Sequence, residues 1–149
     1  MPTLKESREA FLANMCKLSG VSERPQFQAI LDDFIGWSVA RPDVLSYHDK
    51  DHRQNLVSFR LTDSAQVIWT AYPKMNAGAK LSVLPGGNGR LPEELLAEIV
   101  AKLQGVTTEP VRGDKKLDIP FRALKSPARR QVVKEVIDTI LLEVRPALA

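Results

Sequence analysis

Apolar residues recur at intervals of three and four through the first 42 residues, the spacing of side chains along one face of an α-helix. The first segment opens with Thr3 and Glu6, which have the spacing of a capping box, and Gly20 is a natural stop. Ser22 can cap a second segment, which Pro42 ends. Two helices are therefore predicted at the start of the chain. Their apolar faces comprise Leu4, Phe11, Leu12, Met15 and Leu18, and then Phe27, Ile30, Leu31, Phe34 and Trp37.

After residue 44 the pattern changes to alternation, as expected of strands with one buried face. Val57, Phe59 and Leu61, for example, alternate with Ser58 and Arg60. The segments are rich in β-branched and aromatic types and are separated by turn residues, so we expect an antiparallel meander. The predicted strands are NLVSFRL (55–61), QVIWTAY (66–72) and KLSVLP (80–85), with VLSYH (44–48) as a further candidate.

A helix, a strand and a final helix are predicted in the second half of the chain, after the loop GGNGR (86–90). The first helix starts at Pro92 and is closed by Gly105, and the last runs from Ser126–Pro127 to Pro146. The strand between them, KKLDIPF (115–121), contains a proline at position 120, which has no N–H to donate. It should therefore lie at an edge of the sheet.

The predicted order is α-α-β-β-β-α-β-α, an α+β fold in which helices cover one face of a mainly antiparallel sheet. We expect a single domain over residues 1–149, composed of a helical lead (1–42) and a βββαβα unit (45–145). No internal repeat or long linker divides the sequence.

The composition indicates the class of protein but does not indicate a function. The 149 residues are 44% hydrophobic and 26% charged, which is ordinary for a folded globular protein. No apolar run approaches the ~18 residues of a membrane span, and the first residues lack the layout of a secretory signal. The single cysteine, Cys16, cannot form an internal disulfide. These features predict a cytoplasmic protein that does not cross a membrane.

Charge is distributed unevenly along the chain. The net charge is +3, and residues 105–149 alone carry nine basic and six acidic side chains. Between residues 112 and 134, eight basic residues stand against two acidic ones. This surplus suits an anionic partner such as nucleic acid, and a solvated face that keeps the protein soluble is the alternative. The eight basic residues are Arg112, Lys115, Lys116, Arg122, Lys125, Arg129, Arg130 and Lys134.

We interpret these eight residues as a candidate nucleic-acid-binding site at the start of the last helix. Arg129 and Arg130 fall in its first turns, where guanidinium groups and backbone amides can share a phosphate. Cations at a helix N-terminus oppose the helix dipole, a small cost that an anionic ligand relieves. Trp37, Trp69 and Tyr72 would stack on bases if exposed, although aromatic residues on strands more often belong to the core.

The segment LSYHDKDHRQNLVSF (45–59) holds both histidines of the chain, His48 and His52, with Asp49 and Asp51 between them. Histidines four residues apart bind zinc when a helix places them on one face. This segment is dense in turn formers, and in an extended chain the two residues would stand ~13 Å apart. We interpret it as a polar turn, with no metal or cofactor; metal binding and acid–base chemistry are the alternatives.

No other motif predicts catalysis. The loop GGNGR lacks the Gly-Lys-Ser/Thr ending of a P-loop, and no Gly-x-Ser-x-Gly turn is present. Asp43 with Asp114-x-Lys116 matches a metal-dependent nuclease pattern, but Asp114 falls at a strand start rather than within a strand. Cys16 lies beside an apolar stripe, where a buried and inert thiol is expected. We therefore expect a protein that is not an enzyme.

The stretch from NLVSFRL to KLSVLP, followed by a Pro-started helix, an edge strand and a final helix, resembles two groups of small bacterial domains. One is the MmcQ/YjbR group, whose members have been proposed to bind DNA. The other is a domain of unknown function often attached to nuclease or restriction-type proteins. The resemblance covers about residues 45–145 and rests on element order and a strand–Tyr-Pro-Lys–loop–Lys-Leu–strand cadence. It implies DNA binding at the level of the fold and assigns no functional residue.

Two functions from different classes remain open. The first is a non-catalytic nucleic-acid-binding domain that grips phosphates with little sequence preference, DNA being the expected partner. The second is a protein-interaction or assembly module, a homodimer included, in which the apolar faces of the helices exceed what one sheet covers.

Overall fold

A computed structural model describes residues 3–15, 24–48, 56–73, 79–84, 91–111 and 117–144. Its elements are α1 (Leu4–Met15), α2 (Arg24–Val39), β1 (Leu45–Tyr47), β2 (Val57–Leu61), β3 (Val67–Tyr72), β4 (Lys80–Val83), α3 (Glu93–Gln104), β5 (Leu117–Pro120), the short 3-10 helix η4 (Phe121–Leu124) and α4 (Pro127–Val144). The predicted helix signals at Gly20, Ser22 and Pro146 and the loop GGNGR lie outside the described residues.

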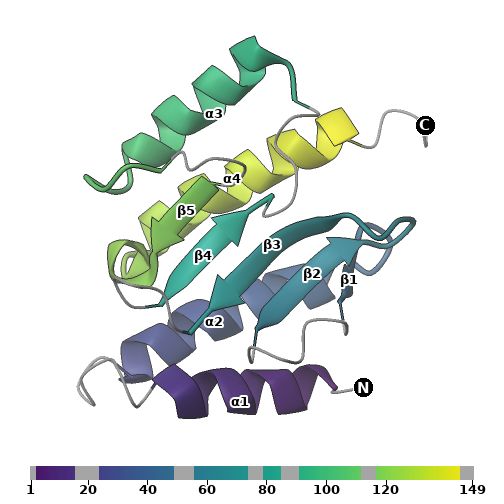
Figure 1. The fold of residues 1–149 in the computed structure, drawn as a ribbon, viewed down its shortest axis with the longest axis vertical. Helices are drawn as coiled ribbons and strands as arrows, with labels where there is room; N and C mark the ends of the chain where they lie inside the picture. Colours follow the sequence, from purple (N-terminus) through teal and green to yellow (C-terminus); the bar gives the residue numbers. More distant parts are fainter. Residues whose placement is uncertain are drawn as a thin grey trace.

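The strands form one antiparallel sheet in chain order, β1-β2-β3-β4-β5 (Figure 1). The α+β prediction is confirmed, and the candidate strand at residues 44–48 is present as β1. β5 lies at the sheet edge, as its proline required. Pro120 closes the ladder opposite Lys80, and the next N–H, that of Phe121, donates to the Ala79 carbonyl at 2.9 Å.

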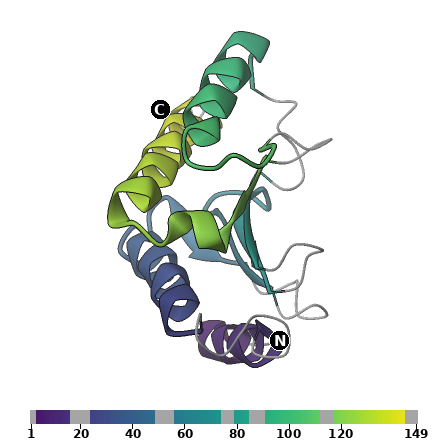
Figure 2. The same ribbon diagram turned by 90° about the vertical axis from the view of Figure 1, so that its left-hand side faces the viewer.

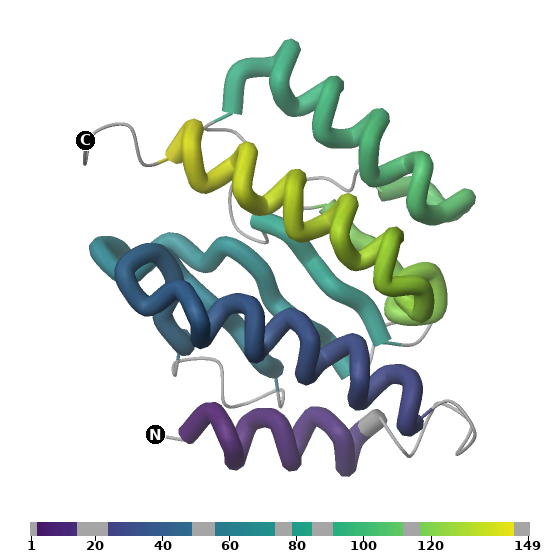
Figure 3. Tube along the Cα trace, turned by 180° about the vertical axis from the view of Figure 1, so that it is seen from behind, coloured from purple at the N-terminus to yellow at the C-terminus, as the bar shows by residue number. Residues whose placement is uncertain are grey.

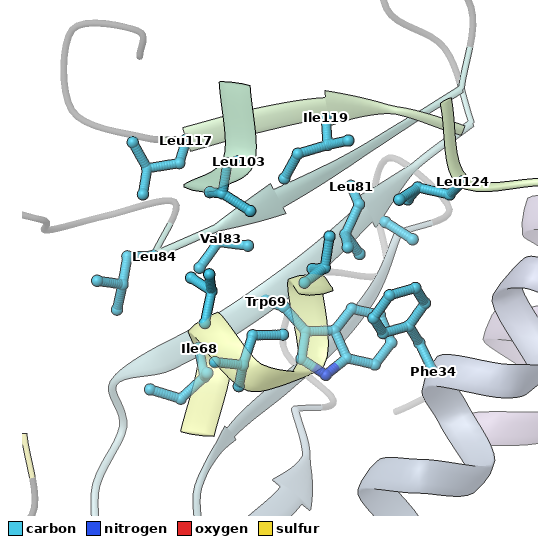
Figure 4. Close-up of a cluster of buried hydrophobic side chains, with 14 of the residues drawn as sticks. Phe34, Ile68, Trp69, Leu81, Val83, Leu84, Leu103, Leu117, Ile119 and Leu124 are labelled. Atoms are coloured by element: carbon cyan, nitrogen blue, oxygen red, sulfur yellow. The ribbon is translucent and has the colours of Figure 1, made fainter. Parts of the chain in front are cut away.

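Helices α2 and α4 lie across one face of the sheet, with α1 beside α2 and α3 beside α4 (Figures 1 and 3). The side view shows no described helix on the opposite face (Figure 2). The predicted arrangement of helices on one face is therefore confirmed. Between the sheet and these helices lies the hydrophobic core, shown in part in Figure 4.

A β-bulge shapes the centre of this core. The register shifts between Phe59 and Arg60 of β2, which leaves Ile68 as an extra residue in β3. The consecutive residues Ile68 and Trp69 are consequently both buried in the same cluster (Figure 4). The Trp69 indole stacks on the Phe59 ring, and its Nε1 atom donates to the Ser38 Oγ atom on α2 at 2.9 Å. The buried indole thus connects the sheet to α2.

A row of polar side chains crosses the other face of the sheet. Ser58, Thr70, Ser82 and Asp118 are successive partners across β2, β3, β4 and β5. The hydroxyl oxygens of Ser58 and Thr70 are 2.8 Å apart, and Ser82 donates to a carboxylate oxygen of Asp118. The three hydroxyl residues are at most 2% exposed, so they are satisfied within the row, by each other or by Asp118, rather than by facing water.

The capping box at the start of α1 is formed as predicted. The Thr3 amide donates to Glu6 Oε1, and the Glu6 amide donates to Thr3 Oγ1, both at 3.1 Å. These hydrogen bonds hold the pKa of Glu6 below its ordinary value. Two backbone amides that the helix itself leaves unpaired are thereby satisfied.

Helix α2 is tied to both neighbouring helices by adjacent aspartates. Asp32 accepts from Arg8 Nε and Nη2 of α1 at 2.6 and 2.9 Å. Asp33 accepts from Arg130 and Lys134 of α4, each at 2.7 Å. Successive residues of a helix point about 100° apart, which lets neighbouring carboxylates serve different partners.

The part of the chain that the structure describes leaves little apolar surface uncovered. Among the described residues, the exposed large apolar side chains are Val39 at 53% and Leu142 at 81%. No described helix combines the length and the apolarity needed to cross a membrane. The apolar face of α4 is buried at Val133, Val136, Ile137, Ile140 and Leu141.

Candidate functional site

The structure divides the eight predicted basic residues into three groups. Arg112, Lys115 and Lys116 lie outside the described residues. Two others, Arg130 and Lys134, are engaged between helices. The remaining three surround the junction of β5, η4 and α4, at the left of Figure 1: Arg122, Lys125 and Arg129.

Arg130 and Lys134 are parts of the fold rather than of an open surface. Their side chains are only 14% and 13% exposed, and Asp33 binds both. Burial alone would raise the pKa of Asp33, but hydrogen bonds from Lys134 and Arg130 outweigh it and lower that pKa. Arg130 also donates from Nη1 to the carbonyls of Leu124 and Lys125, which fixes the turn between η4 and α4.

Arg129 differs from its neighbour because the helix turns it to another side. It is exposed and has no ion pair with another described residue, whereas Arg130 faces α2. The expectation that these two arginines share one phosphate is therefore not supported by their placement. Of the two, only Arg129 lines the pocket described next.

Arg122 and Arg129 line one pocket of about 320 Å³. Its lining also includes the segment that follows α3, with Gly105, Val106, Thr107, Thr108 and Glu109. Arg122 Nη2 donates to Glu109 Oε2 at 2.6 Å, and the two side chains are 54% and 33% exposed. The pocket is thus lined by two arginines and one glutamate.

Gln104, the last residue of α3, organises this segment. Its Nε2 atom donates to the carbonyls of Thr107 and Glu109 at 2.9 and 2.6 Å. Its Oε1 atom accepts from the Val111 amide at 3.1 Å, and the Val111 carbonyl accepts from the Asp118 amide of β5 at 2.9 Å. We call residues 105–111 the α3–β5 wall.

Lys125 lies in the chain between Arg122 of η4 and Arg129 of α4. It is the C-cap of η4, and its Nζ atom lies 6.0 Å from the centre of the Phe27 ring on α2. The residue is exposed, and the distance to Phe27 is that of a weak cation–π contact.

The aromatic candidates for base stacking are engaged elsewhere. Trp69 is fully buried in the core. Trp37 is partly buried beneath the Arg41 guanidinium, which lies 4.7 Å from the ring centre. Tyr72 is only partly exposed at the end of β3, where it has interactions of its own. None of these three residues lines the pocket that contains Arg122 and Arg129.

Of the HDKDH segment, only His48 belongs to the described residues, and its amide donates to the Ser58 carbonyl at 2.9 Å, extending the β1–β2 pairing. The predicted turn at residues 49–52 lies outside the described residues, as do Cys16, Asp114 and Lys116. Within the described ranges, no three His, Cys, Asp or Glu side chains are grouped so as to hold a metal ion.

Sequence reasoning missed the counterions Asp33 and Glu109 and the wall residue Gln104. One signal was available: Arg130 and Lys134 are four residues apart and so share a helix face, while Arg129 does not belong to that face. Nothing local indicates that Asp33, almost a hundred residues away, lies opposite them.

Comparisons with protein-family models, curated proteins and solved structures find no match. The resemblance to the MmcQ/YjbR group and to the nuclease-associated domain consequently stays a prediction.

Proposed function

We propose that the protein is a non-catalytic nucleic-acid-binding domain that contacts phosphates at the corner formed by the α3–β5 wall, η4 and the first turn of α4. Arg122, Lys125 and Arg129 are the proposed contacts among the described residues. The sequence adds three further candidates just ahead of β5: Arg112, Lys115 and Lys116. Arg130 and Lys134 are left out of the proposed interface, because Asp33 already binds both.

The placement of Arg129 carries this proposal. It is the third residue of α4 and is exposed. It lines the same pocket as Arg122, which belongs to the preceding helix η4. A guanidinium beside the positive end of a helix is electrostatically unfavourable in the free protein, and a phosphate relieves that repulsion. Guanidinium forks also match phosphate oxygens in two-point hydrogen bonds.

Contacts of this kind recognise the backbone and not the bases. Phosphates carry no sequence information, so the proposal implies similar affinity for different sequences. It also implies affinity that falls as salt rises, because bound cations release counterions from the nucleic acid.

Fluorescence anisotropy with a labelled DNA strand and a labelled duplex, titrated at several salt concentrations, tests the proposal. Each phosphate contact that is removed should reduce the slope of log K against log[salt] by about 0.9 for duplex or 0.7 for single strands. Arg129→Ala and Arg122→Ala should each weaken binding to every sequence by a similar factor.

Lys5→Ala is the matched control. Lys5 is an exposed cation in the first turn of α1, so its substitution removes the same charge away from the corner. It should leave affinity and slope unchanged. Absence of binding to either DNA at low ionic strength, or equal losses in Lys5→Ala and Arg129→Ala, would contradict a site at this corner.

The alternative, an assembly module, predicts a broad apolar surface. The described residues give it no specific support, since the apolar face of α4 is buried and Val39 and Leu142 are isolated exceptions. A partner protein or homodimer stays a prediction of the sequence.

A further inference from the structure

The corner is a shallow, open hollow that brings the side chains of Arg122 and Arg129 to one place on the surface. The pocket of about 320 Å³ lies within the range of roughly 300–1,000 Å³ typical of small-molecule sites. Its lining combines two arginines with the hydroxyl residues Thr107 and Thr108 and the small side chain of Ala123. A terminal phosphate is tethered to its strand on one side only, so it can turn its free oxygens toward both arginines more readily than a phosphate in the middle of a strand.

The charges in the pocket favour a doubly charged group. Arg122 is already paired with Glu109, so a singly charged phosphodiester gains a full partner only at Arg129. A phosphomonoester carries a charge of about −1.5 to −2 and has three terminal oxygens, enough to bind both guanidinium groups.

We infer that this pocket receives a phosphomonoester, the terminal phosphate of a nucleic-acid strand, held by Arg122 and Arg129 with the Thr107 and Thr108 hydroxyls within the same lining. The inference rests on the proposed function and narrows it from backbone contact to recognition of a strand end. No bond is made or broken; the site binds and orients the phosphate.

Glu109 has a defined part in this binding. In the free protein its Oε2 atom accepts from Arg122 Nη2 at 2.6 Å, the position that a phosphate oxygen takes when the ligand binds. Glu109 is thus an internal competitor. It keeps Arg122 over the pocket, and its negative charge opposes any anion that enters there.

The test compares three strands of one DNA sequence, which carry a 5′-phosphate, a 3′-phosphate or hydroxyls at both ends. At least one phosphorylated strand should bind the full-length protein about tenfold more tightly than the hydroxyl strand, the effect of one or two charge-assisted hydrogen bonds. The advantage should disappear in Arg129→Ala and in Arg122→Ala and persist in Lys5→Ala. Both arginines are exposed or half-exposed, so these variants are expected to fold.

Equal affinity for all three strands overturns the inference and leaves backbone binding intact, whereas binding of none overturns the proposed function as well. A free nucleoside monophosphate is the second arm. If it displaces the phosphorylated strand at matching concentration, the phosphomonoester site stands and its ligand is a mononucleotide; if only the strand binds, the ligand is a strand end.

Glu109→Gln tests whether Glu109 competes with the phosphate for Arg122 or has only a structural role. Removing its charge should strengthen binding of the phosphorylated strand by between about 1.5- and 5-fold, the range of an exposed ion pair. Weaker binding in this variant would mean that Glu109 supports the ligand rather than competing with it.

Discussion

The Nε atom of Arg130 on α4 donates to the Oδ2 atom of Asp33 on α2 at 2.7 Å, across 97 residues of sequence. Lys134 binds the other carboxylate oxygen, so one aspartate pairs with two of the cations that make the C-terminal segment so basic. The charge of that segment is consequently divided between holding α2 to α4 and facing solvent.

Replacing Asp33 with Ala should lower the free energy of unfolding by about 1–3 kcal/mol, because two nearly buried cations lose their counterion. We expect a smaller loss for Arg130→Ala, since Lys134 keeps the carboxylate paired. Urea unfolding followed by circular dichroism measures both. Arg129→Ala is the control and should stay within about 0.5 kcal/mol of the wild type. An equal loss in Arg129→Ala would contradict the division between the two arginines.

The same aspartate should make stability depend on pH at the acidic end. The pKa of Asp33 in the folded protein lies below the ordinary value of 3.8, so its contribution is complete above about pH 4 and is lost as pH falls below that value. The difference in unfolding free energy between the wild type and Asp33→Asn should be constant from pH 7 to about 4 and then shrink. Urea midpoints across this range measure it.

Asp63→Asn serves as the control for that experiment, because Asp63 is an exposed carboxylate in the turn after β2. Its unfolding profile should run parallel to the wild type. If the Asp33→Asn difference grew on acidification instead, the ion pairs with Arg130 and Lys134 would not be the source of the stabilisation.

Gln104 offers a sharper test of the α3–β5 wall. Gln104→Ala should cost about 1 kcal/mol, a discounted value for three partly exposed hydrogen bonds. Gln104→Glu keeps the size of the side chain but places a carboxylate against the Thr107 and Glu109 carbonyls, so it should be at least as destabilising. Hydrogen exchange at the Val111 amide reports the wall directly. Unchanged exchange in both variants would show that Gln104 does not hold it.

At the other end of the chain, Thr3→Ala should destabilise the protein by about 0.5–2 kcal/mol through loss of the capping box, and Thr3→Ser should restore most of the loss. Thermal unfolding of the three proteins provides the comparison. A serine variant as unstable as the alanine variant would indicate that the methyl group of Thr3, not its hydroxyl, matters.

The features that sequence reasoning predicted well depend on neighbouring residues. The capping box at Thr3 requires only Glu6 three positions later, and the edge position of β5 follows from the missing N–H of Pro120. Alternation placed Phe59 correctly in the core, because side chains of a strand alternate between faces whatever the rest of the chain does.

The features that it missed depend on contacts between distant segments. Ser58 reads as a solvent-facing position, yet it is fully buried beside Thr70, since alternation tells which residues share a face but not whether that face is covered. In the same way, a count of charges cannot show that Arg130 faces Asp33 while Arg129 faces a pocket. The candidate site could therefore not be predicted from the sequence, because it depends on which distant residues the fold brings together.

The hydrogen bond from the Asp118 amide to Val111 has a consequence for how this chain can meet another polypeptide. An edge strand with unpaired backbone groups can pair with an added strand from another chain. At β5 the α3–β5 wall already accepts the outward-facing Asp118 amide. An extended peptide could pair with the outer edge of β5 only if the α3–β5 wall moved away. That movement would also remove part of the lining of the pocket beside Arg122. Strand addition there and occupancy of the pocket should therefore exclude each other.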